Sequence, residues 1–207
     1  MKPFEVFTGI VAHLPNDNID TDAIIPSREI VSPEKTGFGE KLFSSWRYLD
    51  KNYAENTEFI LNKEPYRNSS ILLSGYNFGC GSSREMAVWA LAQFGFKVVI
   101  AKSFGEIFRN NCNKNGLLTI QISDAAYLSL SELCHKHPCQ LKVNLADQLI
   151  EAVDKTNEFK FHFDIDATLK EYFLSGQDAI SKTLEHQLAI DEFCQADRKK
   201  RPWMWES

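Results

Sequence analysis

The sequence predicts an α/β fold, in which a parallel sheet covered by helices is followed by antiparallel strands and C-terminal helices. The first observation is that unbroken apolar runs alternate with helical patterns over residues 71–138, as in parallel sheets that are buried on both faces. The second is that residues 140–164 alternate apolar and polar side chains, which is typical of antiparallel strands with one solvated face.

The N-terminal quarter is predicted to contain a strand, a turn, a loop and a helix. Residues 4–13 have the two-residue period of a strand. The Asn- and Asp-rich segment 15–22 favours turns, because these side chains bond their own backbone, and the prolines and glycines of residues 31–39 indicate a loop. We expect residues 40–50 to form a helix with four apolar residues on its buried side: Leu42, Phe43, Trp46 and Leu49.

Three strands and two helices form the predicted centre of the chain. The strands are three apolar runs, at residues 71–73, 97–101 and 117–122. A helix from about Arg84 to Phe94 connects the first two strands. Ser103 and Glu106 have the spacing of a capping box, so the next helix is expected to begin at Ser103 and to stop before Gly116.

A further helix and the antiparallel strands follow. Ser123 is expected to begin a helix that ends near Pro138. The strand predicted at residues 158–164 carries three phenylalanines on one face: Phe159, Phe161 and Phe163. Lys160 and His162 lie on the opposite face, so His162 is interpreted as a solvated strand residue and not as a metal ligand.

Two helices are predicted to close the chain. Asp166 is expected to cap one that ends at Gly176, and Asp178 another that runs to about Phe193. The tail RKKRPWMWES combines a basic run with tryptophans, which predicts that it is anchored on this chain or on a partner.

Composition excludes several classes of protein. A formal net charge of -5 argues against a general nucleic-acid binder, which needs a basic face to displace counterions. No apolar run approaches the roughly 20 residues that span a bilayer, and the residues after Lys2 lack the apolar stretch of a signal peptide. Five cysteines without a CxxC pair indicate free thiols in a reducing cytoplasm.

One cluster of cysteine and histidine residues resembles a metal site only superficially. Cys134 and Cys139 flank His135 and His137. Structural zinc sites usually combine a tighter CxxC pair with a second pair elsewhere. We therefore interpret these residues as the end of a helix and predict no metal site in this chain.

The stretch 75–85, with the sequence GYNFGCGSSRE, has the composition of an anion-binding loop. Gly79 and Gly81 allow the backbone to turn tightly and to approach a ligand closely. The two serines that follow are expected at the start of a helix, where free N–H groups and the helix dipole attract an anion. Arg84 adds a planar donor fork that matches a carboxylate, so the stretch predicts a site for a di- or tricarboxylic acid.

Three other interpretations of this loop are conceivable from its residues. A dinucleotide fingerprint requires a third glycine, but Ser83 and Arg84 occupy that region. A Walker loop requires Gly-Lys-Ser/Thr, which is absent. A structural turn with Ser82 or Ser83 as a simple N-cap stays open on these residues alone.

Three long segments together resemble the small subunits of 3-isopropylmalate dehydratase, in the aconitase superfamily. They are DNIDTDAIIP at residues 17–26, NFGCGSSRE at 77–85 and AKSFGEIFRNNCNKNGLL at 101–118, and they occur in the family's order and spacing. Residues 37–49 also look like this family. The resemblance implies a swivelling β/β/α domain of three layers, with a parallel central sheet and an antiparallel outer sheet. We expect it to span residues 1–165, with 166–207 as a helical extension packed on it.

The resemblance also implies a reaction and partners. The family's enzymes are hydro-lyases that interconvert 2-isopropylmalate and 3-isopropylmalate through isopropylmaleate in leucine biosynthesis. A [4Fe-4S] cluster is carried by the large subunit, so this chain is expected to bind no cofactor itself and to be inactive alone. The expected partners are that large subunit and a dicarboxylate substrate, with no nucleic acid and no membrane.

The site residues follow by matching motifs. Ser82 matches the serine that removes a proton from the carbon next to a carboxylate. Its expected substrate-binding neighbours are Cys80, Gly81, Ser83 and Arg84.

A second segment is expected to decide which substrate is accepted. The resemblance implies that the loop 31–38, which contains Lys35 and Thr36, selects the substrate's side chain. Lys35 stands where many bacterial members carry arginine, and Met86 where histidine is usual, so the side chain accepted by the pocket stays open.

The sequence alone leaves three competing functions. The same half-enzyme acting on 2-methylmalate, citraconate or another small hydroxy diacid is the first alternative. An RNA-binding module is disfavoured by the acidic charge and the intact serines and arginine. A nucleotide-dependent oxidoreductase is disfavoured by the missing third glycine.

Overall fold

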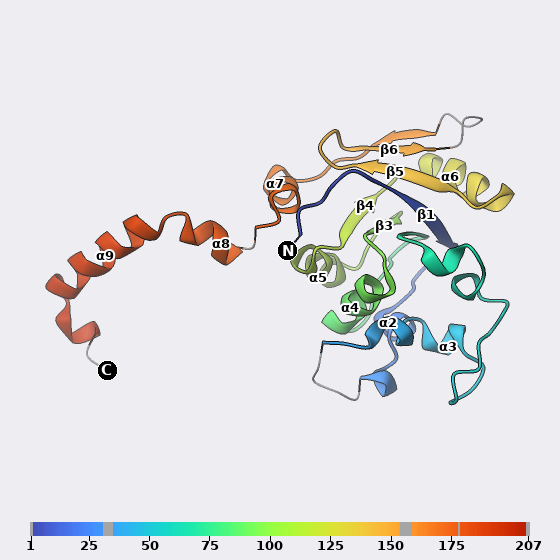
Figure 1. Ribbon diagram of the computed structural model, residues 1–207, viewed down its shortest axis with the longest axis horizontal. Helices are drawn as coiled ribbons and strands as arrows, with labels where there is room; N and C mark the ends of the chain where they lie inside the picture. The colour runs from blue at the N-terminus through green and yellow to red at the C-terminus, as the bar shows by residue number, and fades with distance from the viewer. Residues whose placement is uncertain (1, 31–34, 154–158, 178, 206–207) are drawn as a thin grey trace.

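The computed structural model describes residues 2–30, 35–153, 159–177 and 179–205. Its described strands form one sheet of mixed direction in the order β4-β3-β2-β1-β5-β6-β7 (Figure 1). The strands are β1 (Phe7–Leu14), β2 (Ile71–Ser74), β3 (Val98–Ala101), β4 (Leu118–Gln121), β5 (Gln140–Asn144), β6 (Leu149–Ala152) and β7 (Lys160–His162). The described α-helices are α1 (Thr21–Ile24), α2 (Phe38–Lys41), α3 (Ser44–Arg47), α4 (Glu85–Phe94), α5 (Glu106–Asn115), α6 (Asp124–Lys136), α7 (Ala167–Ser175), α8 (Ala179–Leu184) and α9 (Gln187–Lys200).

Strand β1 belongs to two differently paired parts of the sheet. Residues 7–10 pair with β5 in antiparallel register, whereas residues 11–14 pair with β2 in parallel register. We call β1 to β4 the parallel half and β5 to β7 the antiparallel half. The predicted change of strand type after Pro138 is confirmed, since β5 to β7 pair only in antiparallel register.

The two halves and the helices form three layers. On one face of the parallel half, Leu72 and Val99 lie in a hydrophobic core with residues of α4 and α5. On the other face, Ile71 and Ile100 share a second core with β5, β6 and α6. The antiparallel half therefore covers the face of the parallel half that α4 and α5 leave open. This arrangement confirms the expected β/β/α layers.

The helix expected at residues 40–50 is wrong. The chain forms the two short helices α2 and α3, because Phe43 between them adopts a left-handed conformation with φ 49°. Phe43 is fully buried and stacks on Trp46 with ring centroids 5.2 Å apart, so packing of the aromatic ring holds this backbone conformation. Leu49 lies beyond the break and is 72% exposed, contrary to the expected buried face.

One expected helix start is wrong and another is confirmed. Helix α5 begins at Glu106, with Gly105 as N-cap and no side-chain cap. The Ser103 hydroxyl instead accepts a hydrogen bond from the Asn77 N–H at 2.8 Å, so a long-range contact replaces the capping box. Ser123 caps α6 as predicted, and its hydroxyl accepts from Ala126 N.

The C-terminal extension divides into a packed and an exposed part. Asp166 caps α7, Gly176 ends it, and Phe173 of α7 is buried. Asp178, the second expected cap, lies outside the described residues. Helix α9 has no buried residue, and Figure 1 shows α8 and α9 leading away from the sheet. Phe173 of α7 thus lies in the core that the two halves share, whereas α9 buries no residue. The division at residue 165 and the packing of the extension on the domain stay predictions.

The tail after α9 is anchored on that helix. The Trp205 indole N–H donates to Asp197 at 3.0 Å, and the Arg198 guanidinium lies 4.8 Å from the centre of the Trp205 ring. No described helix has the length and apolarity needed to cross a membrane.

Candidate active site

The loops that leave β1 and β2 lie against each other at one edge of the sheet. Parallel strands end at a common edge, so the segments that follow them in the chain become neighbours there. Main-chain hydrogen bonds join the two loops, from Gly79 N to the Ile19 carbonyl at 2.7 Å and from Thr21 N to the Cys80 carbonyl at 2.9 Å. Residues 17–25 therefore support the loop 75–84 along its length.

Two glycines determine the path of the loop 75–84. Gly79 has φ +74° and Gly81 has φ +88°, and residues other than glycine rarely adopt such angles. A Cβ atom on Gly79 would also lie 2.2 Å from the Phe108 ring. The expected tight turn is present, and close packing on α5 requires glycine at position 79.

The two serines are exposed and lie immediately before α4. The Ser82 carbonyl accepts a hydrogen bond from the Thr21 hydroxyl at 2.8 Å, which holds the backbone. Among the described residues, the hydroxyls of Ser82 and Ser83 have no hydrogen-bond partner. The N-cap of α4 is Arg84, without a side-chain cap, so the interpretation of either serine as a simple N-cap is wrong. Both hydroxyls are available to a ligand.

Arg84 is held by the loop that follows β1. Its Nη1 forms a very short hydrogen bond with the Asp22 carboxylate and donates to the Ile25 carbonyl at 3.2 Å. The bond from Arg84 lowers the pKa of Asp22, so this carboxylate stays ionised at neutral pH. Nη2 and Nε of Arg84 donate to no described residue. These two nitrogens form one of the donor pairs with which a guanidinium binds a carboxylate.

Cys80 contributes its backbone to the site. Its carbonyl accepts the hydrogen bond from Thr21, and residues 20 and 80 form an isolated bridge between the two loops. Burial, and then the nearby Asp20, raises the pKa of the Cys80 thiol, so the thiol stays protonated at neutral pH. A direct role of Cys80 and Gly81 in substrate binding stays a prediction.

Lys35 lies against α4, at Trp89 and Gln93. The Lys35 ammonium lies 4.7 Å from the centre of the Trp89 ring, and its carbonyl accepts from Gln93 at 2.6 Å. Both Lys35 and Thr36 are exposed. The structure therefore connects this segment to the same helix that Ser82, Ser83 and Arg84 precede.

The sequence analysis missed the acidic and hydroxyl residues that support the loop. Asp22 binds Arg84, Thr21 binds the Ser82 carbonyl, and Asp20 caps α1 through Ala23 N at 2.7 Å. The motif DNIDTD predicts a turn and carries part of the family resemblance, but neither of these assigns its side chains to the site. Its position directly after a strand that neighbours β2 was the signal that could have identified these residues as part of the site.

In the cluster around Cys134, the thiols of Cys134 and Cys139 are hydrogen-bonded to each other and form no disulfide. A hydrogen bond with Cys139, followed by burial, raises the pKa of Cys134. Within the described residues, no group of three or more His, Cys, Asp or Glu side chains could hold a metal ion.

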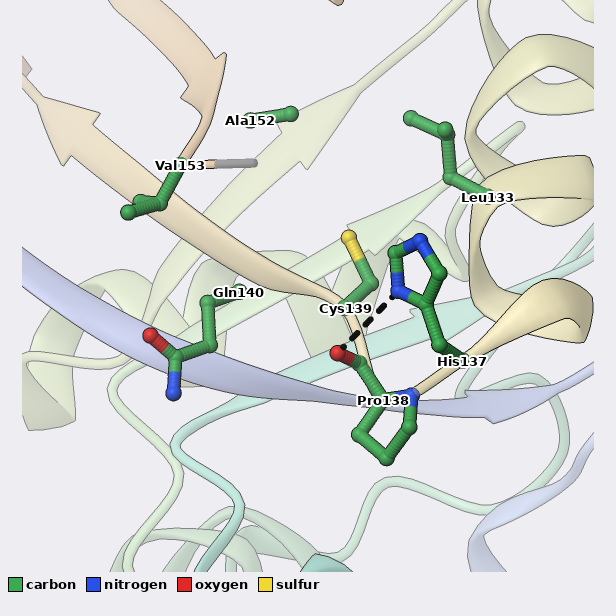
Figure 2. A pocket seen from close by; sticks show the side chains of 7 residues that line it. All are labelled: Leu133, His137, Pro138, Cys139, Gln140, Ala152 and Val153. Atoms are coloured by element: carbon green, nitrogen blue, oxygen red, sulfur yellow. Dashed lines mark hydrogen bonds between the residues drawn. The ribbon is translucent and has the colours of Figure 1, made fainter. Parts of the chain in front are cut away.

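A cavity of about 330 Å³ lies beside this cysteine pair. Figure 2 shows the Cys139 sulfur and the His137 imidazole at this cavity, where the His137 ring lies 3.5 Å from the Pro138 carbonyl. The lining residues come from the end of α6, the segment leading into β5, and the end of β6. None comes from the loops that follow β1 and β2, so this cavity is separate from the candidate site.

Comparisons with known proteins point to one family. The family model for the aconitase C-terminal domain matches residues 1–125. The chain is 42% identical over 205 residues to the 3-isopropylmalate dehydratase small subunit of Cupriavidus necator, covering 99% of this chain and 98% of the relative. It is 45% identical over 193 residues to the protein of the same name from Lactococcus lactis subsp. cremoris, covering 93% of this chain and 97% of that relative.

A solved structure supports the same assignment. The crystal structure of 3-isopropylmalate dehydratase from Methanocaldococcus jannaschii is similar with a TM-score of 0.64 and 25% identity. The similarity covers 91% of this chain and 99% of that structure.

Proposed function

From the premise that the chain belongs to the aconitase C-terminal domain family and, within it, to the small subunits of 3-isopropylmalate dehydratase, we propose that the loop 79–84 is its half of the active site. The complete enzyme is a hydro-lyase. The proposed reaction interconverts 2-isopropylmalate and 3-isopropylmalate through isopropylmaleate, in leucine biosynthesis. One observation carries this proposal. The hydroxyls of Ser82 and Ser83, which have no partner among the described residues, lie on the same loop as an arginine of which only Nη1 is hydrogen-bonded.

Arg84 is proposed to bind a substrate carboxylate through Nη2 and Nε, while Asp22 holds Nη1. Two parallel hydrogen bonds fix the plane of the carboxylate as well as its position. The carbon next to this carboxylate is thereby placed at the serines that precede Arg84. Ser83 is proposed to complete the carboxylate site with its hydroxyl.

Ser82 is proposed to act as its alkoxide, which takes the proton from that carbon and becomes a hydroxyl, and in the hydration of isopropylmaleate this hydroxyl returns the proton. The pKa of a general base should lie near the working pH. The pKa of a serine hydroxyl lies far above it, so the alkoxide forms only where the site stabilises negative charge. The uncapped N-terminus of α4 and the Arg84 guanidinium favour negative charge at this point. Their effect is largest when water is excluded, which we propose happens when the large subunit covers the exposed loop.

The remaining chemistry is proposed to come from the partner chain. A [4Fe-4S] cluster on the large subunit supplies a Lewis acid for the substrate hydroxyl and carboxylate. The described residues of this chain offer no ligand set of three or more suitable side chains for such a cluster. None of the five cysteines, which all lie among the described residues, forms a disulfide, and this agrees with the proposed location in a reducing cytoplasm.

The test is reconstitution of the chain with the large subunit from the same organism, under conditions that load the iron–sulfur cluster. We expect this chain alone to be inactive and the reconstituted pair to convert 2-isopropylmalate into 3-isopropylmalate. NMR spectroscopy of the product measures this conversion. Assays on 2-methylmalate and citraconate run in parallel, because Lys35 and Met86 differ from the residues common in the family. A pair that converts 2-methylmalate and leaves isopropylmalate unchanged would establish the alternative substrate.

A further inference from the structure

Gln93 binds the main chain of the segment 35–38 at two points. Its side-chain Nε2 donates to the Lys35 carbonyl at 2.6 Å, and its Oε1 accepts from the Phe38 N–H at 2.8 Å. One amide group thus satisfies a carbonyl and an N–H that are three residues apart. Because both bonds go to the backbone, they fix the path of the segment whatever its side chains are.

Trp89 supports the same segment one helical turn earlier. Its ring lies 4.7 Å from the Lys35 ammonium and 5.8 Å from the Phe38 ring, measured between centroids for the two rings. The indole N–H donates to the Asn115 side chain at 3.0 Å, and Asn115 in turn donates to the Glu85 carboxylate at 2.9 Å. The ring is therefore held from α5, by a chain of bonds that ends next to Arg84.

The residues after Phe38 are held just as closely. A Cβ atom on Gly39 would lie 2.7 Å from the main chain of Gln93, so the segment packs directly on the last turn of α4. The buried Arg47 donates to the carbonyls of Gly39 at 3.3 Å and Glu40 at 3.2 Å. The whole segment 35–40 is thus attached to α4 and α3.

We propose that Gln93 and Trp89 are positioning residues for substrate selection. They hold the segment 35–38 at a fixed place relative to Arg84, because Arg84 immediately precedes the helix that carries both of them. The resemblance to the family assigns this segment to the recognition of the substrate's side chain, while Arg84 is proposed to hold the substrate's carboxylate. Gln93 and Trp89 are proposed to touch neither of these two groups. This inference rests on the proposed function of the same site.

The test uses Gln93→Ala in the complex with the large subunit. Loss of both backbone bonds should raise the KM for 3-isopropylmalate about tenfold, with kcat within about threefold of wild type. The preference for 3-isopropylmalate, expressed as its kcat/KM divided by the kcat/KM for 2-methylmalate, should fall toward unity by a similar factor. Amide hydrogen exchange of residues 35–40 should become faster. Gln195→Ala, an exposed glutamine on α9, is the matched control and should change none of these quantities.

Two further variants separate a positioning role from general stability. Gln93→Glu keeps the acceptor for the Phe38 N–H and loses the donor to the Lys35 carbonyl, so its KM should lie between those of wild type and Gln93→Ala. Trp89→Phe keeps an aromatic ring beside the Lys35 ammonium but loses the bond to Asn115. Its substrate preference should change less than that of Trp89→Ala.

The outcomes decide the inference separately from the proposed function. If the wild-type pair converts isopropylmalate but Gln93→Ala keeps the wild-type preference, the inference is wrong and the function stands. If the wild-type pair prefers 2-methylmalate, the proposed substrate is wrong. The inference then depends on whether Gln93→Ala removes that preference.

Discussion

The parallel and antiparallel halves of the sheet differ in where their polar side chains lie. In β2 and β3 every residue is buried, so polar chemistry is confined to the loops that follow these strands. In β5 buried and exposed residues alternate, and the exposed face carries Lys142, which lies 4.0 Å from Glu151 of β6. All candidate site residues belong to segments around the parallel half. The comparison shows that a strand buried on both faces can contribute functional side chains only from the loops at its ends.

This difference predicts a separation of effects. Substitutions in the loops at the edge of the parallel half should change turnover and leave stability almost unchanged. Substitutions inside the antiparallel half should do the opposite, because its inward side chains contribute only packing. Each prediction below tests this separation, in order of decreasing expected effect.

Ser82→Ala should lower kcat of the reconstituted pair by about a thousandfold or more, since it removes the proposed base. The hydroxyl has no partner among the described residues, so the free energy of unfolding should change by less than about 0.5 kcal/mol. Steady-state kinetics and urea unfolding measure the two quantities. Near-normal turnover would contradict the role of Ser82.

Ile150→Ala should act on stability alone. Ile150 of β6 is fully buried between the two halves, and removing its outer carbons leaves a cavity that costs about 2–5 kcal/mol. Urea unfolding measures this loss, and kcat should match that of wild type well below the melting temperature. Lys142→Ala, on the exposed face of the neighbouring strand, is the control and should cost less than about 1 kcal/mol. A large fall in kcat for Ile150→Ala would break the proposed separation.

His13 lies on β1, the strand that the two halves share, and its titration should affect stability. Burial, and then the nearby His135, lowers the pKa of His13 to about 4, and its Nε2 lies 3.0 Å from the Tyr127 hydroxyl. As the pH falls from about 6.5 to about 4, the unfolded chain binds a proton that the folded chain does not. The free energy of unfolding should therefore decrease over this range, by at most about 3 kcal/mol.

Urea unfolding of wild type at pH 7 and pH 4.5 measures this dependence. His13→Asn should weaken it, whereas the exposed His162→Asn should leave it as in wild type. An equal pH dependence in wild type and His13→Asn would show that His13 titrates normally in the folded chain.

Asp22→Asn should have the smallest of these effects. The substitution keeps the shape of the side chain but removes the charge that orients Arg84. We expect the KM of the reconstituted pair to rise about tenfold at neutral pH, because a charge-assisted bond is replaced by a weaker one. Asp164→Asn, an exposed residue without a described hydrogen bond, is the control and should leave the KM unchanged. An unchanged KM for Asp22→Asn would mean that Arg84 keeps its position without this carboxylate.

The sequence predicted the parallel strands well, because their apolar runs determine both their identity and their ends. Residues 71–73, 97–101 and 117–122 differ from β2, β3 and β4 by one residue at most at each end. The helices α2 and α3 were not predicted, because burial of the Phe43 ring overrides the local helical pattern. The start of α5 was misplaced for a similar reason, since Ser103 binds a distant residue.

The site was predicted in part. Ser82, Ser83 and Arg84 are adjacent in the chain, so their combination is visible in the sequence. Asp22 lies 62 residues from Arg84, and only the parallel pairing of β1 with β2 brings the two together. The contact of Lys35 with Trp89 was likewise invisible, because neither spacing nor composition relates the two residues.

The double membership of β1 limits how this protein can be shortened. The match to the aconitase C-terminal domain model ends at residue 125, which invites truncation nearby. A fragment without β5 would leave residues 7–10 as an open sheet edge, able to pair with other chains. It would also expose apolar side chains such as Ile71 and Ile100. Such a fragment should aggregate, so the smallest piece suitable for expression must continue at least through β6.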